Sequence, residues 1–143
     1  MLAVIRGAGD IASAIALRLV RCGVSVLMTE IEQPLTVRRT VAFSEAVRMG
    51  KAQVEGVTAV RAWDVSHALE LLSGESVVPV LVDPACACVN DVAPDAVVDA
   101  VLAKRNLGTS MDMAPIVVGV GPGFTVGVDC HAVVETMRGH TLG

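Results

Sequence analysis

Glycines near the start of the chain stand where a phosphate-bearing ligand could be held. Gly7, Gly9 and Ala12 form a G-x-G-x-x-A pattern directly after a short apolar run. In dinucleotide-binding proteins the first glycine permits a sharp turn, the second lets a pyrophosphate approach the backbone, and the small third residue brings helix and strand together. Unpaired N–H groups at the start of the following helix would face the phosphates. The pattern predicts a nucleotide site whose loop includes Ala8 and Ile11.

Charged residues in and after the loop bear on the identity of the nucleotide. Asp10 stands at the expected start of the helix and is predicted to cap it. Glu30 comes 23 positions after Gly7, close to the spacing of an acid that binds a ribose 2′-hydroxyl. Such an acid favours NAD over NADP, because it would repel a 2′-phosphate. Arg38 and Arg39 keep NADP as an alternative, since guanidinium groups bind phosphate oxygens in bidentate geometry.

A second glycine-rich segment is expected to share the site. Gly121, Gly123 and Phe124 follow another apolar run, and glycine loops after strands expose N–H groups that bind anions. Parallel strands end at a common edge of the sheet, where ligands of open α/β sheets bind. The polar residues expected at that edge are Arg6, Glu30, Asp83, Lys104, Asn106 and Thr109.

The residues that could transfer protons do not form a recognised catalytic set. Lys104 and Asp112 are candidates by position alone, and His140 lies in a glycine-flanked segment near the end of the sequence. No G-x-S-x-G, H-E-x-x-H or P-loop motif occurs. The sequence therefore leaves both the catalytic residues and the question of enzymatic activity open.

The cysteines give no clear metal or redox signature. The four are Cys22, Cys86, Cys88 and Cys130. The C-x-C spacing of Cys86 and Cys88 differs from the C-x-x-C of metal and redox motifs, so packed or edge thiols are expected. Asp129, Cys130 and His131 are adjacent, and three consecutive side chains meet at one ion only on an irregular backbone. We therefore expect reduced cysteines and no metal site.

Alternating strand and helix patterns predict the elements that must hold these residues. Near-continuous apolar runs predict strands at 2–6, 24–29, 77–82, 96–101, 116–120 and 132–136. Helices are expected over 10–21 and over 64–72, the second capped by Asp64. The order predicts an α/β, Rossmann-like fold: one domain over residues 1–143, with a mostly parallel sheet and helices on both faces.

Residues 31–63 exceed an ordinary connection and are expected to form an insertion beside the nucleotide site. An extended segment is predicted over 37–41, followed by a short helix over 44–49. The pair Glu55-Gly56 predicts a tight turn between strands at 52–54 and 57–62. The insertion would therefore contain a small β-hairpin.

The composition argues against several classes of partner. The chain has 143 residues, a net charge of −4, two Phe, one Trp and no Tyr, so neither a basic surface nor stacking aromatics for nucleic acid are present. The longest uncharged stretch, 113–128, is too short to span a membrane and contains two prolines and four glycines. No signal-peptide pattern occurs. We expect a cytoplasmic protein with no nucleic-acid or membrane partner.

Seven blocks spread over nearly the whole chain carry a family resemblance. They are RGAGD (6–10), TEIEQP (29–34), VRRTVAFSEAV (37–47), LVDP (81–84), VDAVLAKRNLGT (98–109), DMAPIVVGVGPGF (112–124) and VVETMRGH (133–140). Together they resemble the accessory family of the selenium-dependent molybdenum hydroxylase system, which is related to xanthine dehydrogenase accessory proteins. The resemblance implies a maturation role, with a hydroxylase apoenzyme as partner and a molybdenum-cofactor-type nucleotide as ligand.

Three functions are compatible with these observations. The chain could be an accessory protein that binds a nucleotide or cofactor, an NAD(P)-dependent oxidoreductase, or a non-catalytic scaffold for the hydroxylase. The positions of Arg38 and Arg39 distinguish between these functions. Side chains that line the pocket would favour a phosphate-bearing ligand, whereas side chains exposed to solvent would favour the scaffold function. Members of the family are typically longer, so the chain is expected to be a fragment or a short member. Apolar surface left exposed would favour a homodimer.

Overall fold

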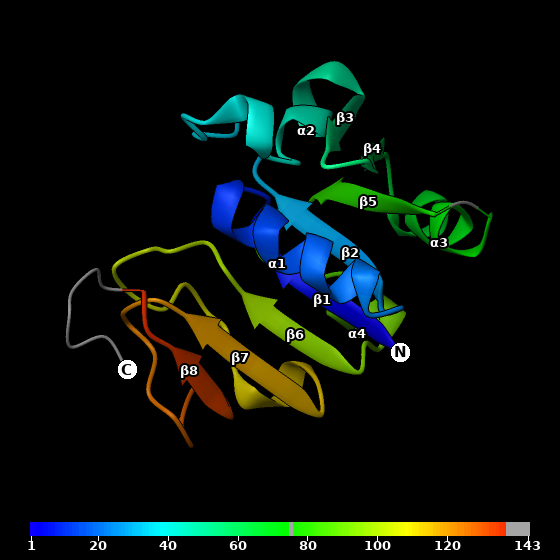
Figure 1. Cartoon of the computed structure of the whole chain (residues 1–143). Helices are drawn as coiled ribbons and strands as arrows, with labels where there is room; N and C mark the ends of the chain where they lie inside the picture. Colours follow the sequence, from blue (N-terminus) through cyan, green and yellow to red (C-terminus); the bar gives the residue numbers. More distant parts are fainter. Residues whose placement is uncertain (75, 137–143) are drawn as a thin grey trace.

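The computed structural model describes residues 1–74 and 76–136, and these form an α/β fold around one eight-stranded sheet (Figure 1). The strands are β1 (Leu2–Arg6), β2 (Ser25–Glu30), β3 (Lys51–Val54), β4 (Val57–Ala62), β5 (Val77–Val82), β6 (Ala96–Asp99), β7 (Ile116–Val120) and β8 (Ala132–Val134). Their order across the sheet is β3-β4-β5-β2-β1-β6-β7-β8. Every neighbouring pair is parallel except β3 with β4. The mostly parallel sheet predicted from the sequence is confirmed.

Helices cover both faces of the sheet. They are α1 (Asp10–Arg21), α2 (Glu45–Met49), α3 (Val65–Gly74) and α4 (Val89–Val92). Side chains of α1 and α2 pack in one hydrophobic cluster, and side chains of α3 and α4 pack in another. Neighbouring residues of β1 divide between the clusters, since Ile5 belongs to the first, Val4 to the second, and both are fully buried. Burial on both faces explains the near-continuous apolar runs.

The connection between α2 and α3 forms a hairpin that extends the sheet. In the antiparallel β3–β4 pair Val54 faces Val57, and the turn residues Glu55 and Gly56 have φ values of 47° and 83°. Two consecutive positive φ values are typical of a type I′ turn, whose twist matches that of the strands. Because β4 also pairs with β5 in parallel, the hairpin adds two strands at one edge.

Local structure differs from the sequence prediction at residues 37–41 and at the ends of β6 and β8. Residues 37–41 are not extended: Arg39–Val41 is a 3₁₀ turn in which the Ala42 N–H donates to the Arg39 carbonyl. No strand pairs with this segment in the described structure, so local bonds satisfy its backbone. Strand β6 ends at Asp99 rather than at residue 101, and there the Val101 N–H donates to Asp99 Oδ1 at 3.1 Å in place of a bond to a neighbouring strand. Strand β8 ends at Val134 rather than at residue 136.

Candidate functional site

A crevice opens where the carboxyl ends of β1, β2, β5 and β6 meet. It has a volume of about 580 Å³ and is lined by the loops that follow these four strands. The lining includes Gly7, Gly9, Asp10, Ile11, Glu30 and Arg38, all predicted from the sequence. Strand β1 lies between β2 and β6, so the loops that follow these three strands meet at this edge of the sheet. Ligands of open α/β sheets bind in such a place.

The glycine loop has the geometry that its sequence predicts. Gly7 has a φ of 96°, and a Cβ atom there would lie 3.1 Å from the Ala100 carbonyl oxygen. Only glycine makes this turn without strain. Gly9 precedes α1, and a Cβ atom on it would meet only Thr36 Oγ1, at 3.7 Å. The space in front of Gly9 lets a ligand approach the start of the helix.

Glu30 connects the glycine loop to the end of β2. Its Oε2 accepts a hydrogen bond from the Ala8 N–H at 2.9 Å, and its Oε1 accepts one from the Ile31 N–H at 2.8 Å. The Gly7 N–H donates to the Thr29 carbonyl at 2.9 Å, so two successive amides of the loop bind the β2 end. Ala8 itself is fully buried. Each carboxylate oxygen of Glu30 retains a lone pair that could accept a ligand hydroxyl.

Asp10 and Arg38 form an ion pair at the mouth of the crevice. Asp10 is the first residue of α1, and Gly9 occupies the cap position, so the prediction of Asp10 as the cap was wrong. The Asp10 carboxylate accepts a hydrogen bond from the neighbouring Ile11 N–H at 3.0 Å. The Arg38 side chain is 67 % exposed. An exposed pair of this kind is weak and leaves Arg38 free to exchange its partner for a phosphate.

Arg39 does not line the crevice. Its Nε and Nη2 donate to the two carboxylate oxygens of Glu45, each at 2.5 Å. The hydrogen bonds from Arg39 lower the pKa of Glu45. The two arginines that were predicted together are therefore separated: Arg38 lies at the crevice and Arg39 binds the start of α2.

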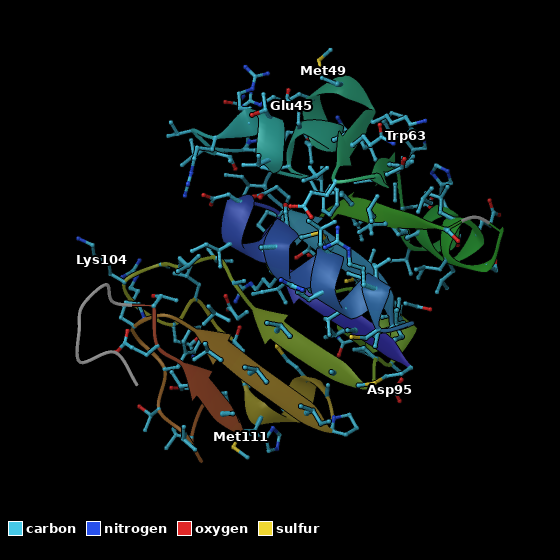
Figure 2. All side chains as sticks on the ribbon, in the orientation of Figure 1. Glu45, Met49, Trp63, Asp95, Lys104 and Met111 are labelled. Atoms are coloured by element: carbon cyan, nitrogen blue, oxygen red, sulfur yellow. The ribbon has the colours of Figure 1, made fainter. Side chains whose placement is uncertain are left out.

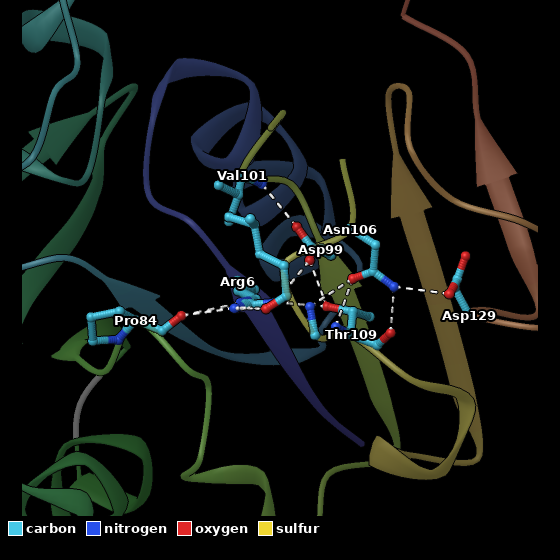
Figure 3. A network of polar contacts seen from close by, with 9 residues as sticks. Arg6, Pro84, Asp99, Val101, Asn106, Thr109 and Asp129 are labelled. Carbon is cyan, nitrogen blue, oxygen red and sulfur yellow. Dashed lines mark hydrogen bonds and ion pairs between the residues drawn. The ribbon is translucent and has the colours of Figure 1, made fainter. Parts of the chain in front are cut away.

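A buried arginine joins three of the loops that line the crevice (Figure 3). Arg6 is 4 % exposed, and its Nη1 lies 3.3 Å from Asp99 Oδ2 and 3.0 Å from Thr109 Oγ1. Its Nη2 donates to the carbonyls of Pro84 and Leu107, each at 2.9 Å. The guanidinium thereby holds the chain after β1, β5 and β6 in a fixed relation. Arg6 is satisfied by the protein itself and is a positioning residue.

Asn106 extends this polar network toward the last strands. Its Oδ1 accepts hydrogen bonds from the N–H groups of Gly108 and Thr109, at 2.9 and 2.8 Å. Its Nδ2 donates to Asp129 Oδ1 at 2.9 Å, which Figure 3 shows at the right of the network. Asn106 thus shapes the loop after β6 and contributes no lining to the crevice.

The second glycine-rich segment does not take part in the crevice, so the prediction of a joint site was wrong. A Cβ atom on Gly123 would lie 2.6 Å from the Arg105 Cα, and one on Gly119 would lie 2.5 Å from the ring of Phe124. Phe124 packs against the second hydrophobic cluster. Gly121 and Gly123 also take left-handed φ values of 89° and 98°. These glycines permit close packing of the chain, and the Gly121 N–H donates to the Val134 carbonyl at 2.9 Å.

The predicted proton-transfer residues are not brought together. Lys104 is exposed and outside the crevice, and Figure 2 shows its side chain at the periphery of the molecule. Asp112 accepts a hydrogen bond from the Ser110 hydroxyl and lines a second cavity. Asp83, which was predicted to lie at the ligand-binding edge, does not line the crevice and instead faces α4, where its Oδ2 accepts the Cys88 N–H at 2.8 Å. His140 lies outside the described residues.

The cysteines and histidines form no group of three metal-ligating side chains in residues 1–74 and 76–136. His131 Nδ1 accepts the Val117 N–H at 2.9 Å and so supports the backbone near β8. Cys130 is buried, whereas Cys22 is exposed at the end of α1.

Sequence reasoning missed the apolar part of the crevice wall. The missed apolar lining residues include Ile31, Leu35, Val37, Val101, Leu102 and Leu107. They come from irregular segments that have no periodic pattern, and only the tertiary fold brings them together. A lining of aliphatic side chains with few polar groups is typical of sites for small organic ligands.

A known protein matches nearly the whole chain, but the match assigns no activity. The chain is 56 % identical over 142 residues to a protein of Escherichia coli (strain K12) described as "Uncharacterized protein YqeB". The match covers 99 % of this chain and 26 % of the relative, so the chain spans about a quarter of the relative's length. No protein-family profile matches the chain. No solved structure matches it. Within the described residues, no helix has the length and apolar character needed to cross a membrane.

Proposed function

We propose that this chain is a nucleotide-binding module of an accessory protein that acts in the maturation of molybdenum hydroxylases. The observation that carries nucleotide binding is the crevice of about 580 Å³ in front of the loop at Gly7 and Gly9. The maturation role rests on the family resemblance of the seven sequence blocks, and a hydroxylase apoenzyme in the cytoplasm is the proposed partner.

The strand order supports this proposal. Apart from β3 and β4, the strands lie in the order β5-β2-β1-β6-β7-β8. Numbered along the chain without that hairpin, this is the order 3-2-1-4-5-6 of the dinucleotide-binding fold. We therefore interpret the sheet as Rossmann-like and residues 31–63 as an insertion. In such sheets the phosphates lie at the start of the helix that follows the first strand.

The residues at the crevice fit a nucleotide. The N-terminus of α1 offers backbone N–H groups and a partial positive charge to a phosphate, and Gly9 leaves the approach open. Arg38 would supply a cation once it exchanges its partner Asp10. Leu35, Val37 and the aliphatic side chains after β6 would pack against a planar base. The volume lies within the range of about 300–1,000 Å³ that is usual for ligand pockets.

An NAD(P)-dependent oxidoreductase is the second candidate, because Glu30 lies in the crevice at the end of β2, where a ribose diol could bind. In that function the crevice would also need a group that moves a proton. Lys104 and Asp112 lie elsewhere, which favours binding and transfer of a nucleotide over hydride chemistry.

A homodimer remains our proposal for the assembly. The exposed apolar residues Val126, Val128, Val133 and Val134 lie in β8 and in the segment before it, at one edge of the sheet. An edge strand without charged residues is a surface on which another chain can pair. Sedimentation equilibrium tests this proposal directly, and a monomer at all concentrations contradicts it.

Calorimetric titration with NAD, NADP, FAD, CTP and a molybdopterin dinucleotide tests the function. We expect one of them to bind, and to stabilise the fold by about 2.7 kcal/mol at a hundredfold excess over Kd. Arg38→Gln should weaken binding about ten- to a hundredfold, since a charge-assisted hydrogen bond contributes about 1.5–3 kcal/mol. Arg39→Gln is the matched control and should bind as the unmodified chain does. Absence of binding by every ligand, or equal weakening by both substitutions, contradicts the proposal.

A further inference from the structure

Two buried thiols lie close together in the connection between β5 and α4. Cys86 and Cys88 are 0 % and 2 % exposed, and both pack in the second hydrophobic cluster. Nucleotide binding as proposed above uses neither of them, since neither lines the crevice. Cys86 lines the second cavity, whose volume is about 740 Å³.

The two cysteines lie in one tight turn, and their side chains contact each other. The Val89 N–H donates to the Cys86 carbonyl at 3.4 Å, which closes a turn around residues 87 and 88. Within this turn the Cys86 and Cys88 thiols are joined by a side-chain hydrogen bond. Contact between the two sulfurs is the arrangement from which a disulfide can close.

Contacts with Asp83 hold this turn in place. The Cys86 N–H donates to the Asp83 carbonyl at 3.0 Å, and the Cys88 N–H donates to Asp83 Oδ2 at 2.8 Å. Cys86 has a φ of 56°, a left-handed conformation that is uncommon for a residue with a side chain. Such conformations persist only where surrounding contacts impose them, and they concentrate at functional positions.

The two thiols differ in acidity. A hydrogen bond from the Cys88 thiol lowers the pKa of Cys86, and the positive charge of Arg6 adds to this effect. The hydrogen bond to Cys86, together with burial, raises the pKa of Cys88. Cys86 is therefore the thiol suited to act as the attacking thiolate, while Cys88 keeps its proton.

We propose that Cys86 and Cys88 are a redox-active dithiol that closes into a disulfide by exchange with a low-molecular-weight disulfide. The Cys86 thiolate attacks one sulfur of the reagent, and a mixed disulfide forms as the first reagent thiolate leaves. Cys88 then loses its proton and attacks the Cys86 sulfur, which releases the second reagent thiolate. The two protein thiols lose two electrons and two protons, and the reagent disulfide becomes two thiols.

The remaining cysteines provide internal comparisons. Cys22 is exposed at the end of α1, and Cys130 is buried in the same cluster as the pair but in the connection to β8. Because the pair is buried, exchange requires local opening beside the second cavity. We expect Cys22 to react faster and to stop at a mixed disulfide with the reagent.

Incubation of the whole chain with oxidised glutathione, followed by alkylation and peptide mass spectrometry, tests the proposal. We expect the peptide that contains Cys86 and Cys88 to lose the mass of two hydrogen atoms and to regain it with dithiothreitol. Cys88→Ser should accumulate the mixed disulfide at Cys86, and Cys130→Ser should behave as the unmodified chain does. The readout requires no nucleotide, so its result is independent of the proposed function.

Two outcomes would overturn the proposal. In the first, alkylation of the unfolded chain still modifies both Cys86 and Cys88 after Cys22 has been fully converted. In the second, the Cys86 thiol forms a bridge to Cys130 instead. Both outcomes can be measured on the unmodified chain, so the test does not depend on whether the serine variants fold.

Discussion

The guanidinium of Arg6 lies 3.3 Å from the carboxylate of Asp99, and both side chains are almost completely buried. This ion pair joins β1 to β6, which are neighbouring parallel strands of the sheet. The Thr109 hydroxyl donates to the same carboxylate at 2.5 Å, so the charge of Asp99 is balanced and hydrogen-bonded. The crevice floor therefore depends on a buried charge pair that would be costly to break.

Replacement of Arg6 should destabilise the fold strongly. Arg6→Met leaves the Asp99 carboxylate buried without its cation, which costs about 3–5 kcal/mol of unfolding free energy. Arg21→Met is the control, because Arg21 pairs with Glu55 at 2.7 Å in an exposed position, where such pairs contribute about 0–1 kcal/mol. Urea unfolding measures both, and equal losses would show that burial of the Arg6 pair has no special role.

The two glycines of the first loop should differ in their tolerance of alanine. Gly7→Ala places a Cβ atom 3.1 Å from a carbonyl oxygen at a φ of 96°, so we expect a loss of about 1–3 kcal/mol. Gly9→Ala places its Cβ atom in ordinary contact with Thr36, and we expect a change of no more than about 1 kcal/mol. Thermal and urea unfolding measure both losses of stability. A larger loss for Gly9→Ala than for Gly7→Ala would contradict the loop conformation described above.

The first loop was predictable because its signals are local. Gly7 and Gly9 stand between an apolar strand and an amphipathic helix, and Glu30 ends the next strand, so the order of elements alone brings these residues to one edge. Strand periodicity and turn residues likewise predicted the β3–β4 hairpin at Glu55 and Gly56.

The second glycine segment was misassigned for a physical reason. A glycine that leaves room for a ligand and a glycine that leaves room for a neighbouring side chain have the same sequence signature. Gly119 and Gly123 are of the second kind, since Phe124 and the Arg105 backbone fill the space that a ligand would need. Sequence patterns do not distinguish the two, because the filling atoms come from distant or irregular segments.

Removal of the Asp10 carboxylate should strengthen nucleotide binding. Asp10 pairs with Arg38 at the mouth of the crevice and adds a negative charge where a phosphate would bind. Asp10→Asn frees the guanidinium and removes this repulsion, so we expect affinity to rise about three- to tenfold. Calorimetric titration of the double variant with Arg38→Gln is the control. A gain that persists without Arg38 would assign the effect to the lost repulsion alone.

The pKa of Glu45 provides a test of the position of Arg39. The hydrogen bonds from Arg39 lower this pKa below the ordinary range of a glutamate, so the pairing stabilises the fold at neutral pH. The stabilisation is present above the pKa of the unfolded chain and is lost as the pH falls through the folded pKa. Arg39→Gln should return the pKa toward its ordinary value, and Arg38→Gln should leave it unchanged, because Arg38 pairs with Asp10 instead. Carboxyl-detected NMR titration measures these values, and a shift caused by Arg38→Gln would show that both arginines lie at the same carboxylate.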